Sequence, residues 1–134
     1  MAIYPSEEWI KLFMEAVNAN KNYEEAAKNW EGDFLFVVDA DEQLKEPATF
    51  YLDLWHGKCR GVAVVRPGEE KKAAFVYSGS YGNWKKLINK QIDPIQGLLT
   101  GKFKLKGDMI KVLRAVRAAK ELVETAGKVP TEFV

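Results

Sequence analysis

The residue types that most often carry chemistry are scarce in this 134-residue chain. It has one histidine, His56, and one cysteine, Cys59. A single cysteine excludes an internal disulfide and any metal site that needs several thiolates. His56 lies in a predicted tight turn over residues 55–58, and no serine or cysteine pattern beside it indicates a nucleophile. We interpret His56 as a solvated turn residue rather than a catalytic base, and Cys59 as a small buried hydrophobe rather than a nucleophile.

The carboxylates form one short cluster and one isolated site. Asp39, Asp41 and Glu42 are close enough in sequence to attract a cation, but they lack the spaced ligands, glycine and terminal glutamate of a calcium-binding loop. We interpret them as part of a solvated loop and expect no metal ion and no cofactor. Asp53 interrupts an apolar segment, so it needs a polar or charged partner if that face is buried. A structural role for Asp53 is favoured over a catalytic one.

Two groups of residues have the chemistry to contact phosphate. Residues 79–82, Gly-Ser-Tyr-Gly, precede a predicted helix whose first N–H groups can hold an anion. The glycine fingerprints of dinucleotide and nucleoside triphosphate sites are missing there. The lysines of residues 84–86 and 102–106 can touch the phosphates of lipid headgroups or of coenzyme A. A solvated face is favoured for these lysines, and transient contact with a membrane surface stays open.

Composition indicates a single globular domain over residues 1–134. Hydrophobic residues make up 47% and charged residues 29% of the chain, as in ordinary soluble domains. The net charge of +1 provides no strong overall field for nucleic acid, so we expect no nucleic-acid partner. No apolar run approaches the roughly 20 residues of a membrane-spanning helix. Secretory and peroxisomal signals are also missing from the two ends, which predicts a cytoplasmic location.

Apolar periodicity predicts that helices come first, then strands, then helices around a last strand. Ser6 is a suitable N-cap, and the apolar stripe behind it indicates a first helix that ends near residues 18–20. Phe34–Asp39 is a nearly continuous apolar run, which predicts a strand with both faces covered. Asp93 followed by Pro94 marks the start of a short helix. The other predicted elements are a helix over 23–30, strands over 48–55, 59–66 and 73–78, a helix over 81–89, and one long last helix between Asp108 and Gly127.

The stretch from Leu99 to Met109 connects the last of these elements. Gly101 and Gly107 frame a short strand in which Phe103 and Leu105 point to one face, while lysines 102, 104 and 106 point to the other. This pattern predicts an edge strand whose lysines prevent edge-to-edge pairing.

The order and spacing of these segments resemble the sterol carrier protein-2 (SCP2) family. The helix that ends in Leu-x-Gly-Lys, the alternating strand, the Gly-Asp pair and the helix after it are similar to the closing signature of that family. Tyr51–Leu54 resembles its second strand, and Ala74–Ser78 followed by Trp84–Leu87 resembles its fourth strand and the next helix. The resemblance implies an α+β fold: a five-stranded mixed sheet with helices packed on one face and a long C-terminal helix. It also implies lipid binding in an apolar tunnel between the helices and the sheet.

The leading hypothesis is therefore non-catalytic binding or transfer of a fatty acid, a fatty acyl-CoA, a phospholipid or a sterol-like lipid. No combination of acid, base and nucleophile indicates an enzyme. The alternative is a protein–protein interaction module, or a homodimer, with a filled core and no lipid ligand. The candidate lining residues come from the apolar faces around the glycine-framed strand: Trp84, Leu87, Ile88, Ile95, Leu98, Leu99, Phe103, Leu105, Met109, Val112, Leu113 and Val116.

Overall fold

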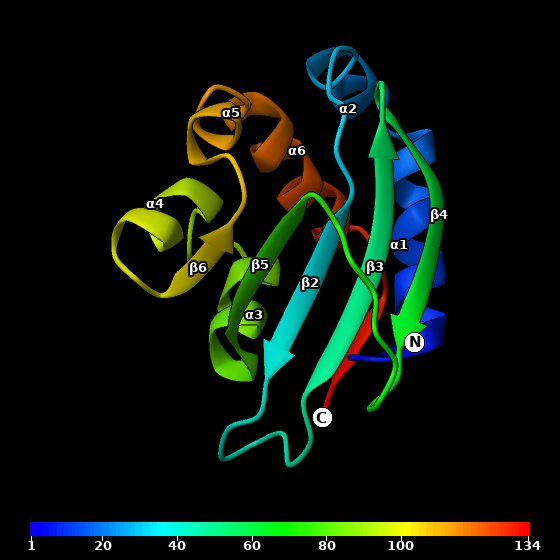
Figure 1. Ribbon diagram of the computed structural model, residues 1–134. Helices are drawn as coiled ribbons and strands as arrows, with labels where there is room; N and C mark the ends of the chain where they lie inside the picture. Colours follow the sequence, from blue (N-terminus) through cyan, green and yellow to red (C-terminus); the bar gives the residue numbers. More distant parts are fainter.

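The computed structural model describes residues 1–134 and shows an α+β fold with six helices and a five-stranded mixed sheet. The strands lie in the order β4-β3-β2-β5-β6, and the helices pack on one face of the sheet (Figure 1). This architecture confirms the predicted fold class. The elements are β1 (Ala2–Tyr4), α1 (Glu7–Ala19), α2 (Lys21–Ala26), β2 (Phe34–Asp39), β3 (Ala48–Trp55), β4 (Lys58–Val65), β5 (Phe75–Ser80), α3 (Tyr81–Ile88), α4 (Pro94–Leu99), β6 (Phe103–Lys106), α5 (Met109–Leu113), α6 (Val116–Gly127) and β7 (Thr131–Phe133).

Alternation along the strands separates a helix-covered face of the sheet from an open face. On the covered face, Phe34 of β2 lies opposite Leu52 of β3 and beside Phe75 of β5. On the open face, Leu35 and Val37 are only half-buried. Both faces of this strand were predicted to be covered, and the cover comes from helices on one face and from a single loop on the other.

That loop is the connection between β4 and β5, residues 66–74, which crosses the open face (Figure 1). Its end is fixed at Asp33, whose carboxylate accepts hydrogen bonds from the Ala74 N–H at 2.6 Å and the Tyr51 hydroxyl at 2.7 Å. Burial raises the pKa of Asp33, but these hydrogen bonds outweigh it, and the net shift of the pKa is downward. Lys71 adds a cation–π contact, 4.1 Å from the centroid of the Tyr51 ring.

Strand β6 lies at the edge of the sheet, as predicted. Phe103 is buried on the covered face, and Lys104 and Lys106 are exposed. The Phe103 ring occupies space next to two glycines: a Cβ atom would come within 2.6 Å of the ring at Gly79 and within 2.9 Å at Gly97. Any side chain at either glycine would therefore force the ring to move.

Helix α1 begins at the predicted cap, where the Ser6 hydroxyl accepts a hydrogen bond from the Trp9 N–H at 3.1 Å. Its buried face includes Trp9 and Phe13, whose rings are stacked with centroids 5.2 Å apart. The Trp9 indole N–H donates to the Thr131 hydroxyl at 2.9 Å. This bond joins α1 to a small parallel sheet of β1 and β7, which pairs the two ends of the chain and which the sequence pattern did not predict.

The single last helix predicted after Asp108 is two helices, α5 and α6, with a break at residues 114–115. No glycine or proline marks the break, so tertiary packing must cause it. Helix α6 packs against α1, α2, α3 and α4. Helix α5 instead contacts the far end of the sheet, where the Lys111 ammonium lies over the Trp30 and Phe75 rings. No helix of the chain has both the length and the apolar composition needed to cross a membrane.

Candidate functional site

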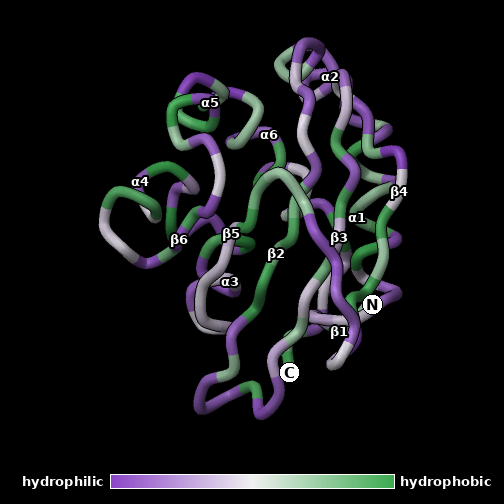
Figure 2. Tube along the Cα trace, viewed as in Figure 1, coloured by the Kyte–Doolittle hydropathy of each residue, from purple (hydrophilic) through white to green (hydrophobic).

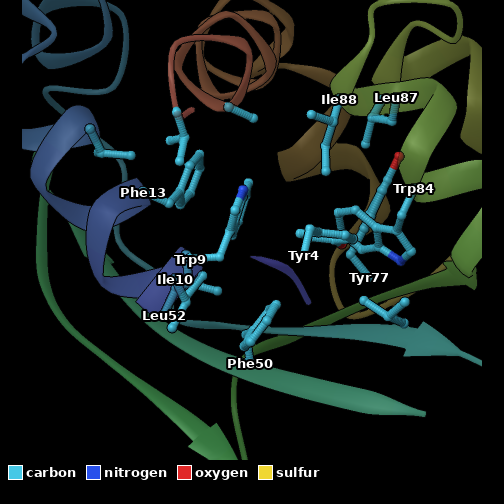
Figure 3. Close-up of a cluster of buried hydrophobic side chains, with 14 of the residues drawn as sticks. Tyr4, Trp9, Ile10, Phe13, Phe50, Leu52, Tyr77, Trp84, Leu87 and Ile88 are labelled. Carbon is cyan, nitrogen blue, oxygen red and sulfur yellow. The ribbon is translucent and has the colours of Figure 1, made fainter. Parts of the chain in front are cut away.

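An apolar cavity of about 100 Å³ lies between the covered face of the sheet and the helices. Eighteen of its 19 lining residues are hydrophobic. Figure 3 shows Trp9 and Phe13 of α1 on one side of the cluster, with Trp84 and Ile88 of α3 on the other. The lining residues are Tyr4, Trp9, Phe13, Phe34, Phe36, Phe50, Tyr77, Trp84, Leu87, Ile88, Pro94, Ile95, Leu98, Leu105, Val112, Ala119, Leu122, Val123 and Ala126.

Two hydrogen-bonding groups in the wall of this cavity are satisfied by backbone carbonyls. The Trp84 indole N–H donates to the Val37 carbonyl at 2.9 Å, and the Tyr77 hydroxyl donates to the Pro94 carbonyl at 2.9 Å. Burial raises the pKa of Tyr77, so this hydroxyl stays protonated and remains a donor. Aromatic contacts fix the same rings, with the centroids of Phe36 and Trp84 5.3 Å apart.

A second, smaller cavity of about 40 Å³ adjoins the first. All nine of its lining residues are hydrophobic, and they include Tyr23 and Trp30. Four residues line both cavities: Phe34, Val112, Ala119 and Leu122. Displacement of this common wall would join the two spaces.

Two tyrosine hydroxyls are exceptions to the pattern of satisfied polar groups. Tyr51, Tyr77 and Tyr81 each donate a hydrogen bond within the chain. Tyr4 and Tyr23 donate none, although each is only 1% exposed. Tyr4 lines the larger cavity and Tyr23 the smaller one. Each cavity thus has in its wall one buried tyrosine whose hydroxyl donates no hydrogen bond within the chain.

Seven of the twelve predicted lining residues lie in the wall of the larger cavity: Trp84, Leu87, Ile88, Ile95, Leu98, Leu105 and Val112. The other five lie elsewhere. Phe103 is buried behind the wall, in contact with Trp84. Val116 is half-buried at the start of α6. Leu99, Met109 and Leu113 are exposed on α4 and α5.

The structure separates residues that one continuous last helix would place on a single face. Within α5, Val112 is buried, whereas Met109 and Leu113 beside it are 38% and 36% exposed. The break at residues 114–115 then separates all three from Val116, which lies on α6.

The sequence pattern missed lining residues from the first half of the chain. Trp9 and Phe13 belong to the apolar stripe of the first predicted helix, and such helical spacing indicates only that they are buried. Phe34, Phe36 and Phe50 alternate toward the covered face, and that alternation was the available signal for them. No local pattern indicated Tyr4, which reaches the cavity only because β1 pairs with β7.

The residues considered for chemistry have structural partners. Asp53 accepts hydrogen bonds from the Arg60 guanidinium, both at 3.1 Å, which confirms the predicted structural role. His56 lies in the β3–β4 turn, and its Nε2 is 2.6 Å from the Glu31 carboxylate. Cys59 is buried, as predicted, and burial raises the pKa of its thiol to about 11. Such a thiol is a poor nucleophile near neutral pH.

The possible anion site at residues 79–82 is occupied by the chain itself. The Asp41 carboxylate accepts a hydrogen bond from the Gly82 N–H at 2.8 Å, and the Ser80 hydroxyl accepts one from the Asn83 N–H at 3.2 Å. Asp41 therefore joins the β2–β3 loop to the start of α3 rather than remaining a solvated loop residue. No group of three or more metal-ligating side chains occurs in the structure.

Solved structures with the same fold include sterol carrier proteins. A crystal structure of sterol carrier protein 2 superposes with a TM-score of 0.82 at 31% sequence identity, covering 92% of this chain and 97% of that chain. A Thermus thermophilus protein described as possibly a sterol carrier protein superposes with a TM-score of 0.83 at 31% identity, covering 95% of this chain and 90% of that one.

A curated relative with a similar sequence is much longer. Hydroxysteroid dehydrogenase-like protein 2 of Xenopus tropicalis is 33% identical over 105 residues, which is 78% of this chain but 22% of that protein. Its name refers to the whole longer protein and assigns no reaction to the matched part. The model of the SCP-2 sterol transfer family matches residues 10–120, and the chain belongs to this family.

Proposed function

We propose that the chain binds one lipid molecule, holds its apolar part in the larger cavity, and carries it without chemical change. The observation that supports this most strongly is the cavity wall, in which 18 of 19 residues are hydrophobic. Membership in a family of lipid-binding and lipid-transfer domains supports the same class of ligand. Burial of apolar ligand surface is favourable by about 25 cal/mol per Å² before ordering costs. The candidate ligands are a fatty acid, a fatty acyl-CoA, a phospholipid or a sterol-like lipid.

The volume of the cavity indicates how such a ligand is accommodated. A dry cavity of about 150 Å³ with an aliphatic and aromatic wall holds one benzene molecule. The larger cavity measures about 100 Å³, so a long acyl chain enters only if parts of the wall move. The wall shared by the two cavities is the part whose displacement joins them into one tunnel. Ligand binding would then make a minor, opened conformation the dominant one.

The hydroxyls of Tyr4 and Tyr23 are the groups that orient the polar part of the ligand. Neither hydroxyl donates a hydrogen bond within the chain, and each tyrosine lines one of the cavities. A hydroxyl, carboxyl or ester oxygen of the ligand can accept a hydrogen bond from either one. This favours an amphiphilic lipid over a plain hydrocarbon. Outside the cavity, the exposed lysines of β6 are candidates for transient contact with a membrane surface.

Titration with a fluorescent long-chain fatty acid tests the proposal. The protein is first freed of co-purified lipid by denaturation and refolding. We expect saturation near one ligand per chain and competition by unlabelled long-chain lipids. A series of probes with acyl, acyl-CoA and sterol groups then ranks the ligand classes. Failure of all three probes to saturate would refute the proposal.

The alternative of a filled core without a lipid ligand predicts a different result. Native mass spectrometry of the protein as isolated from cells would then show the bare chain or a dimer, and no bound lipid. We expect instead an adduct with the mass of a lipid, which disappears after the denaturing step.

A further inference from the structure

The large exposed hydrophobic side chains of this protein are concentrated on two short helices. Met1, Ile3 and Val134 are near the termini, and Trp55 is covered on one side by the Arg60 guanidinium, 4.7 Å from its ring centroid. The four others lie on α4 and α5: Leu99, Met109, Ile110 and Leu113. Leu99 is 65% exposed and Ile110 is 63% exposed. Single exposed leucines are common on protein surfaces, but here four of the eight large exposed hydrophobic residues fall on two short helices that both line the larger cavity. We refer to these four residues as the patch.

Both helices are apolar on their inner and outer sides. Leu98 lines the cavity and its neighbour Leu99 is exposed. In the same way, Val112 lines the cavity and Leu113 is exposed. Hydrophobic segments of α4 and α5 are visible in green on the outer curves of both helices (Figure 2). A helix that is hydrophobic all round is normally covered on every side, so these outer faces are expected to be covered in use.

The segment of the sequence that contains these exposed residues is also basic. Residues 99–117 contain six basic residues and one acidic residue, a net charge of +5. The rest of the chain contains 14 basic and 18 acidic residues, a net charge of −4. The small overall charge of +1 thus conceals a strongly basic segment on a slightly acidic protein. Such an asymmetry indicates a partner with negative charge.

Five of the six basic side chains are free to meet that partner. Lys111 is not, because its ammonium donates to the Glu31 carbonyl and lies over the Trp30 ring. The other five are exposed and take part in none of the ion pairs of the structure: Lys102, Lys104, Lys106, Arg114 and Arg117.

We propose that the surface formed by α4, β6, α5 and the first turn of α6 docks on a lipid bilayer that contains anionic phospholipid. The exposed apolar side chains enter the headgroup boundary, and the five free cations contact the lipid phosphates. A second copy of the chain is a poorer partner, because a two-fold interface would bring the same basic segment of both copies together. Docking would place the α4–α5 wall of the cavity against the bilayer, from which a ligand could enter. This role of docking rests on the proposed function. Docking itself is measurable without any ligand.

Flotation with vesicles tests this surface directly. The probes are vesicles of phosphatidylcholine alone and vesicles in which about one-third of the lipid is phosphatidylglycerol. We expect the protein to float with the anionic vesicles at least about tenfold more strongly than with the neutral ones. Raising NaCl from about 0.05 to about 0.5 M should weaken this binding, since salt screens surface charge.

Matched substitutions separate the docking surface from non-specific adhesion. Ile110→Ser removes an apolar side chain from the patch, whereas Ile3→Ser makes the same change at an isoleucine that is 46% exposed elsewhere. Lys104→Glu with Lys106→Glu reverses two charges of the surface, and Lys45→Glu with Lys72→Glu reverses two exposed lysines in loops. The patch variants should lose about tenfold or more in vesicle binding, and the control variants should bind like the unmodified protein.

Three results would overturn the docking proposal. The first is equal binding of the protein to neutral and anionic vesicles, and the second is an equal loss of binding in patch and control variants. The third is a dimer that Ile110→Ser dissociates, in a protein that binds no vesicles. Fatty-acid titration without vesicles keeps the two proposals apart. If docking variants bind fatty acid normally and vesicles poorly, both proposals are supported. If no variant binds fatty acid but the vesicle results hold, docking stands and the proposed function fails.

Discussion

Phe34 of β2 and Val112 of α5 form part of the wall of both cavities, one from the sheet and the other from the helical layer. Val112 is 8% exposed and is the only buried residue of its five-residue helix. A change in side-chain size at this position therefore alters the space available to a ligand more than it alters the packed core.

We predict that Val112→Phe retains the melting temperature of the lipid-free protein but binds an acyl chain about tenfold more weakly, a loss of roughly 1.4 kcal/mol. The added ring enters space that the ligand would occupy. Differential scanning calorimetry and fatty-acid titration on delipidated protein measure the two effects, because bound lipid would itself raise the melting temperature.

Val17→Phe is the matched control for this substitution. Val17 is buried on α1 and lines neither cavity. The same increase in volume there overpacks the core and is expected to reduce stability by about 1–3 kcal/mol. If Val112→Phe destabilises the protein as much as Val17→Phe does, Val112 belongs to solid core.

Tyr4→Phe is expected to weaken binding of an amphiphilic lipid severalfold, because one lost hydrogen bond costs about 1 kcal/mol. The free energy of unfolding should stay unchanged. The Tyr4 hydroxyl has no partner in the chain that could be lost. Tyr77→Phe provides the contrast in the same cavity wall, because it removes the bond to the Pro94 carbonyl. That variant should lose about 1 kcal/mol of stability with a smaller effect on affinity. The reverse pattern would exclude Tyr4 as the ligand's hydrogen-bond donor.

Asp33 is expected to make the anchoring of the β4–β5 connection dependent on pH. Its folded-state pKa lies below its ordinary value of 3.8, so the carboxylate form stabilises the fold. This stability is fully present above the unfolded-state pKa and is lost as pH falls through the folded-state pKa. Asp33→Asn should thus lower the free energy of unfolding by about 1 kcal/mol near neutral pH, and the difference should vanish in acid. Chemical denaturation over a pH series measures it. Asp39→Asn, which removes an exposed carboxylate outside this hydrogen-bond network, is the control.

Lys111→Met is expected to loosen α5 without unfolding the domain. The substitution keeps the aliphatic stem but removes the ammonium that bonds the Glu31 carbonyl and lies 4.9 Å from the centroid of the Trp30 ring. Amide exchange in residues 109–113 should become about tenfold faster, and lipid should dissociate faster. Hydrogen-exchange mass spectrometry and stopped-flow release follow the two rates. Lys106→Met is the control, and equal exchange in both variants would show that Lys111 does not restrain the helix.

The sheet was largely predictable because its strands follow local rules. Apolar runs and alternation gave the bounds of β2 and β3, and the spacing of Phe103 and Leu105 identified β6 as an edge strand. Turn chemistry placed the β3–β4 hairpin, where His56 and Gly57 have positive φ angles of 49° and 80°. These features depend on residues close together in sequence.

The parts that were not predicted depend on distant contacts. The break between α5 and α6 has no local signal, since Arg114 and Ala115 are both compatible with a helix. The pairing of β1 with β7 joins residues about as far apart as the chain allows, and it decides that Tyr4 reaches the cavity. Residues that line a cavity and residues that fill a core share the same periodicity. The sequence therefore indicated Leu87 and Ile88 as lining residues, but it also indicated Phe103, which is buried behind the wall.

The position of the Phe103 ring against Gly79 and Gly97 links the size of three side chains outside the cavity wall to the volume of the cavity. The ring takes up volume that two missing side chains leave free, and it touches Trp84 without lining the cavity itself. Shortening Phe103 would let Trp84 retreat and enlarge the ligand space from behind, with no change at any residue that meets the ligand. Adding a methyl group at Gly79 or Gly97 would push the ring forward and narrow that space. Substitutions at Phe103, Gly79 or Gly97 would therefore change the size of lipid that the proposed site accepts, although none of these residues lines the cavity.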